Sequence, residues 1–85
     1  SSDEYQQIDF TIYPNPASQE LTIGTNENIT SLNFTIIDIF GKAIFLNKQV
    51  DSKILDVSPL TDGVYLFIVE NQEGQKGVKR LIIHK

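Results

Sequence analysis

The sequence contains no cysteine, so no disulfide bond can reinforce its fold. Eighty-five residues form at most one domain. A chain of this length buries roughly 60–65% of its unfolded surface, which makes its core thin. Conformational entropy costs on the order of 1.5 kcal/mol per ordered residue, and hydrophobic burial only narrowly exceeds that cost. The missing cysteines leave the redox compartment open, because small exported domains exist with and without disulfides.

The sequence also lacks a long hydrophobic run. A membrane-spanning helix needs about 18 or more consecutive apolar residues, and no such run occurs. The first seven residues, SSDEYQQ, are polar and acidic. We therefore expect residues 1–7 to form a linker and not a signal peptide, and residues 8–85 to form the domain. The net charge of −4 argues against nucleic acid as the main partner, because phosphate neutralisation needs a broad basic surface.

Residues that carry chemistry are scarce. His84 is the only histidine, and it lies one residue from the end of the sequence, where a general base is poorly positioned. Zinc sites need several His or Cys ligands, and no calcium-loop or phosphate-loop motif occurs. The sequence therefore predicts no enzyme activity, no metal and no cofactor.

The residues that are present favour β-structure. Ile, Val and Thr account for 23 of the 85 residues, whereas Ala occurs twice. Apolar and polar residues alternate with a period of two in most segments. The predicted strands are residues 8–13, 20–24, 32–36, 44–46, 54–57, 64–69 and 78–83. Because residues 64–69 are apolar at every position, we expect that strand to lie centrally with both faces buried.

Turn residues separate the predicted strands. Pro14 and Pro16 lack a backbone N–H and should end the first strand. Asp38 and Gly41 occupy the first and fourth positions of a type I turn, and residues 71–77 read as a polar hairpin loop. Seven short strands at intervals of about ten residues predict an all-β fold, an immunoglobulin-like antiparallel β-sandwich. A small barrel is the alternative, and the strand order stays open.

The aromatic residues allow a second interpretation, an adhesion or carbohydrate-binding module. Such a module would need an exposed aromatic platform, and the sequence has no Trp. The phenylalanines in strand patterns should instead lie in the core; they are Phe10, Phe34, Phe45 and Phe67. Tyr65 should be packed as well, with its hydroxyl hydrogen-bonded near a rim.

The last predicted strand is basic in an acidic protein. Residues 76–85 contain Lys76, Lys79, Arg80 and Lys85 and carry +4, while the other 75 residues carry −8, from three Lys and eleven acids. Lysines in a strand at the edge of a sheet protect it from aggregation. The same segment also offers a backbone edge and a local positive potential, which a partner protein can recognise by strand addition and electrostatic steering.

Four segments in order resemble a known family. They are YPNPASQELTI, DIFGKAI, LTDGVYLFIV and KRLIIHK, at residues 13–23, 38–44, 60–69 and 79–85. The set resembles the C-terminal sorting domain of the type IX secretion system of Bacteroidota, in its type A form. Pro14 and Pro16 match the P-x-P of that family, Asp38 and Gly41 its D-x-x-G, and Gly63 and Tyr65 its G-x-Y. Lys79, Arg80 and Lys85 fall in its basic terminal strand, the part most closely tied to recognition.

The resemblance implies a function without catalysis. Such a domain directs a fused N-terminal cargo through the outer-membrane translocon. Its partners are therefore the translocon with its shuttle proteins, the cargo, and a sortase-like cysteine peptidase that cuts upstream of the domain. The cargo passes through the periplasm and is then released or anchored at the cell surface. The resemblance also implies a seven-stranded immunoglobulin-like sandwich.

Overall fold

The computed structural model describes residues 8–26, 28–49 and 52–85. For residues 45–49 it describes the backbone and not the side chains. Seven strands form two antiparallel sheets, with orders β1-β2-β5 and β4-β3-β6-β7. The strands are β1 Phe10–Tyr13, β2 Glu20–Thr25, β3 Asn33–Asp38, β4 Ala43–Gln49, β5 Ile54–Asp56, β6 Gly63–Glu70 and β7 Lys76–Ile83. A short 3-10 helix, Ile29–Ser31, precedes β3.

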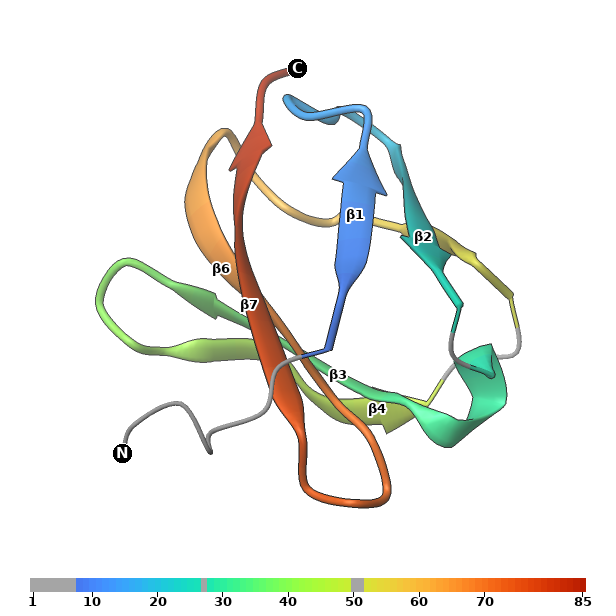
Figure 1. The fold of residues 1–85 in the computed structure, drawn as a ribbon. Helices are drawn as coiled ribbons and strands as arrows, with labels where there is room; N and C mark the ends of the chain where they lie inside the picture. The colour runs from blue at the N-terminus through green and yellow to red at the C-terminus, as the bar shows by residue number, and fades with distance from the viewer. Residues whose placement is uncertain (1–7, 27, 50–51) are drawn as a thin grey trace.

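The two sheets pack face to face as the predicted β-sandwich (Figure 1). All seven predicted strands are present, with bounds that differ by a few residues. The predicted linker, residues 1–7, lies outside the described residues. On one side of the sandwich β1 and β7 lie next to each other and run in the same direction (Figure 1).

The core lies between the sheets and receives alternate residues from each strand. Leu21 and Ile23 of β2 are fully buried. The ring of Phe67 on β6 contacts two other buried rings, with centroids 6.1 Å from Phe10 and 5.5 Å from Phe34. Burial of these three phenylalanines confirms the sequence prediction, and the side chain of Phe45 lies outside the described residues.

The central strand differs from its prediction in one respect. β6 does lie inside the four-stranded sheet, between β3 and β7. However, only its inward residues are buried, Tyr65, Phe67 and Val69, whereas Val64 and Leu66 remain 41% and 39% exposed. The prediction that both faces are buried is therefore wrong for the domain alone. The reason is geometric: a two-layer sandwich covers one face of each sheet, and no third layer among residues 8–26, 28–49 and 52–85 covers the other.

The turns behave as the sequence predicts. Pro14 and Pro16 follow the end of β1. The Gly41 N–H donates to the Asp38 carbonyl at 3.0 Å, and the Asp38 carboxylate accepts from the N–H groups of Phe40 and Lys42. Gly41 has φ +84°, which glycine adopts without strain. The hairpin between β6 and β7 is tighter than predicted, because β7 already begins at Lys76.

Gly77 permits the close approach of β1 to β7. A Cβ atom at this position would lie 2.6 Å from a ring carbon of Phe10 and 2.9 Å from the Ile8 carbonyl oxygen. With hydrogen there instead, the Ile8 N–H donates to the Lys76 carbonyl at 3.3 Å. Because residue 77 has no side chain, the segment from Ile8 to Phe10 can pack against β7 and close one side of the sandwich.

Gly77→Ala should lower the free energy of unfolding by about 1–3 kcal/mol, because the backbone of Ile8 and the ring of Phe10 must move to admit a methyl group. Urea denaturation followed by circular dichroism measures the change. Gly24→Ala is the matched control: its Cβ would meet the hydroxyl of Thr11, an exposed side chain that can change rotamer. Equal stability of both variants and the wild type would contradict the proposed role of Gly77.

Candidate recognition surface on the last strand

β7 carries three of the seven basic residues, Lys76, Lys79 and Arg80, and is hydrogen-bonded to β6 along its whole length. The register runs from Lys76 opposite Glu70 to Ile83 opposite Gly63. Gly77, Leu81 and Ile83 point inward and are buried, so the even-numbered residues point away from the core. The basic segment is therefore an integral strand of the four-stranded sheet.

The other edge of β7 is also occupied. The Asn15 side chain accepts from the Ile82 N–H at 3.0 Å and donates to the Arg80 carbonyl at 2.9 Å. Ala17 continues this pairing in parallel: its N–H donates to the Ile82 carbonyl at 2.8 Å, and its carbonyl accepts from the His84 N–H at 2.9 Å. A partner strand adding to this edge would have to displace Asn15 and Ala17.

Lys85 joins the end of β7 to two loops. Its ammonium donates to the carbonyls of Ser18 and Ser58, at 2.6 Å and 3.1 Å. Its backbone N–H donates to the carboxylate of Asp62 at 2.9 Å. These three hydrogen bonds hold the charge of Lys85 against the domain, so it contributes to the fold.

The carboxylate of Asp56, near Lys85, accepts hydrogen bonds from Ser58. The pKa of that carboxyl is lowered from its usual 3.8, because the side chain and the backbone N–H of Ser58 donate hydrogen bonds to it and because Lys85 adds positive charge. A depressed pKa stabilises the fold above the usual value, and that stabilisation is lost as the pH falls through the lowered pKa.

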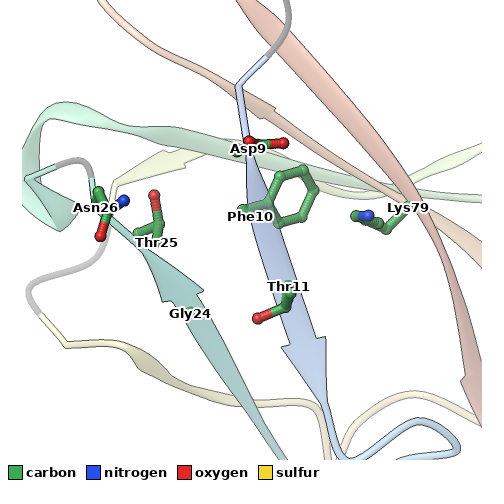
Figure 2. A pocket seen from close by; sticks show the side chains of 7 residues that line it. All are labelled: Asp9, Phe10, Thr11, Gly24, Thr25, Asn26 and Lys79. Atoms are coloured by element: carbon green, nitrogen blue, oxygen red, sulfur yellow. The ribbon is translucent and has the colours of Figure 1, made fainter.

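Lys79 and Arg80 point to opposite faces of the sheet. The Lys79 ammonium lies 5.7 Å from the centroid of the Phe10 ring, a cation–π distance. It borders an open pocket of about 410 Å³ between β1, β2 and β7 (Figure 2). The pocket is lined by Asp9, Phe10, Thr11, Gly24, Thr25, Asn26 and Lys79. Arg80 lies instead on the outer face, with Val78 and Ile82.

The remaining motif residues lie at the end of the sheet where β7 ends, since Gly63 pairs with Ile83. The Tyr65 hydroxyl donates to the Thr61 carbonyl at 2.7 Å, and its ring is buried, as predicted. Gly63 lies above this ring, where a Cβ atom would be 3.8 Å from it. Asp38 forms the neighbouring turn and pairs with Tyr65 across the sheet. These residues position strands and bring together no catalytic group.

Chemistry-bearing clusters are missing from the described part of the chain. No group of three or more His, Cys, Asp and Glu that could hold a metal occurs among residues 8–26, 28–49 and 52–85. Within the same ranges, no helix is long and apolar enough to cross a membrane. His84 is exposed, and its backbone is what anchors it.

A comparison with family models agrees with this picture. The model described as a secretion system C-terminal sorting domain matches residues 11–84. The chain is a member of that family. The match confirms the resemblance seen in the four motif segments, and with it the role of a C-terminal sorting signal for type IX secretion. No curated protein matches the chain.

Membership has consequences for partners and destination. A sorting domain acts together with the type IX secretion machinery and with a fused cargo, which reaches the cell surface or the extracellular space. The family is not an enzyme family. The alternative of an adhesion or carbohydrate-binding module is not favoured by the match.

Sequence reasoning missed the residues that hold β7 in the sorting domain. Asn15, Ala17 and Gly77 were not singled out for this purpose, although Asn15 stands between two motif prolines. The sequence does contain a polar side chain between two prolines, neither of which can donate a backbone hydrogen bond. This pattern indicates a hydrogen-bonding role for Asn15 but not its partner.

Asn15→Asp should lower the free energy of unfolding by about 1–2 kcal/mol, because the carboxylate still accepts from Ile82 but opposes the Arg80 carbonyl. Amide hydrogen exchange should also become faster at Ile82. Asn26→Asp makes the same change at an exposed asparagine outside this contact. Unchanged protection of the Ile82 amide in Asn15→Asp would show that the side chain does not hold the strand.

Proposed function

We propose that the secretion machinery recognises this sorting domain as a folded surface, through the basic side chains of β7. The observation that carries the proposal is the double-sided hydrogen bonding of β7, to β6 on one edge and to Asn15 and Ala17 on the other. A backbone committed in this way is not a free peptide, which leaves side chains as the recognised features.

The basic residues then divide into two roles. Lys79 and Arg80 are exposed and project from the middle of β7, where a partner can reach them. Lys85 holds the end of the strand through the carbonyls of Ser18 and Ser58. Pro14 and Pro16 flank Asn15. At the same end of the sheet, Gly63 pairs with Ile83, and Asp38, Gly41 and Tyr65 set the turn and strand geometry beside it.

The proposed route follows from the family. The cargo with its attached domain crosses the periplasm, the translocon and its shuttle proteins carry it through the outer membrane, and a sortase-like cysteine peptidase cuts upstream of the sandwich. The polar composition of residues 1–7 suits an accessible cleavage segment. The cargo is then released or anchored at the cell surface.

A periplasmic reporter fused to residues 1–85 should appear outside the cell in a host with type IX secretion. Leu81→Asp should leave the reporter in the periplasm, because Leu81 is fully buried and a carboxylate there unfolds the domain. A reporter carrying only residues 76–85 should also stay inside. Immunoblots of periplasm, cell surface and medium measure the distribution.

The double variant Lys79→Glu with Arg80→Glu separates recognition from folding, since both side chains are exposed. It should keep its denaturation midpoint and lose export. Retention of the wild-type fusion in the periplasm would overturn the sorting function. Export of the reporter carrying residues 76–85 alone would instead show that an unfolded tail suffices.

A further inference from the structure

The outer face of the four-stranded sheet is apolar at its centre. On β6 and β7 the outward residues pair across the strands as Val64 with Ile82, Leu66 with Arg80, and Ile68 with Val78. Ile37 of β3 extends this surface beside Leu66. Val64, Leu66 and Val78 are 41%, 39% and 55% exposed. We call these seven residues the outer face.

The composition of β6 is that of a strand covered on both sides. Inward and outward positions alike are apolar from Val64 to Val69, a pattern typical of strands buried between two layers. The part of the chain that the structure describes supplies only one of those layers. Contiguous exposed apolar surface on a small soluble domain marks a contact site, so the composition indicates that a second layer comes from another molecule.

Arg80 gives this surface its charge specificity. Its guanidinium is exposed among Leu66, Val78 and Ile82, and among the described residues it forms no ion pair. On β6 and β7, the second cation that points outward is Lys76, which stands opposite Glu70 at the far end of the two strands. The outer face therefore presents one uncompensated cation inside an apolar surround. A carboxylate fits a guanidinium in a bidentate pair.

We infer that the outer face docks a protein of the secretion machinery whose contact surface is apolar and carries a carboxylate opposite Arg80. This inference rests on the proposed function and specifies which side of β7 is recognised. The other side, with Lys79 above Phe10, is an open and mainly polar pocket, and it lacks the apolar area that a stable protein contact requires.

Two substitutions on the outer face test the inference in the reporter assay. Arg80→Glu should reduce the exported fraction about tenfold or more, because removing one partner of a desolvated ion pair and reversing its charge is costly. Val78→Lys should have a similar effect by placing a charge in the apolar contact. Both residues are exposed, so the denaturation midpoint of the purified domain should stay near that of the wild type.

Matched controls lie on the three-stranded sheet. Lys53→Glu makes the charge reversal beside β5, and Ile54→Lys adds a lysine at a site 53% exposed, close to the 55% of Val78. Both should export normally. Lys79→Glu makes the reversal on the same strand but toward the pocket, and it should impair export less than Arg80→Glu.

Each contrary result has a distinct meaning. Normal export of Arg80→Glu and Val78→Lys, with the wild type exported, overturns the docking face and leaves the sorting function intact. Retention of the wild type overturns both. A defect seen with only one of two unrelated reporters would assign the face to the cargo. A concentration-dependent dimer in sedimentation, abolished by Val78→Lys, would assign it to a second copy of this chain.

Discussion

The structure depends on the hydrogen bonds that hold β7 at both edges. One edge pairs with β6, and the other accepts the Asn15 side chain and the backbone of Ala17. The contacts of Asn15 and Ala17 with β7 join residues more than sixty positions apart, as the separation of 67 between Asn15 and Ile82 shows. In a chain without disulfides, such long-range closure brings the first and last strands together. It also covers a basic strand that would otherwise offer a free edge for aggregation.

Because Asn15 and Ala17 occupy the second edge of β7, a partner has to recognise other features of this strand. A strand with a free edge is recognised mainly through its backbone, and side chains then add specificity. β7 offers side chains on two faces instead: Lys79 above an aromatic ring, and Arg80 among aliphatic residues. The positive charge that the sequence concentrates in its last ten residues is thus divided by the pleat of the strand. Lys85 is withdrawn into hydrogen bonds with two loop carbonyls.

Much of the fold could be predicted because its signals are local. The period of two in most segments, together with the apolar run at 64–69, located the seven strands. The prolines located the end of β1, and Asp38 with Gly41 located a turn. Tyr65 was expected to bond through its hydroxyl, and it does. The hydrogen bonds of Asn15 and Ala17 to β7 could not be predicted, because an asparagine between two prolines does not indicate which distant backbone it will contact. The need for glycine at residue 77 could not be predicted either, because it arises from Phe10 and Ile8, which approach this position only in the folded state.

The error at β6 has a different origin, and it concerns function. An unbroken apolar run indicates that both faces of a strand become buried. It does not indicate whether the covering layer belongs to the same chain or to another molecule. The domain alone satisfies the rule on its inner face only, with Phe67 and Val69 fully buried and Leu66 39% exposed. The family acts by engaging a secretion apparatus. The outer face remains apolar, and its Arg80 forms no ion pair with any described residue, so the sequence of β6 and β7 fits a partner surface as well as the fold.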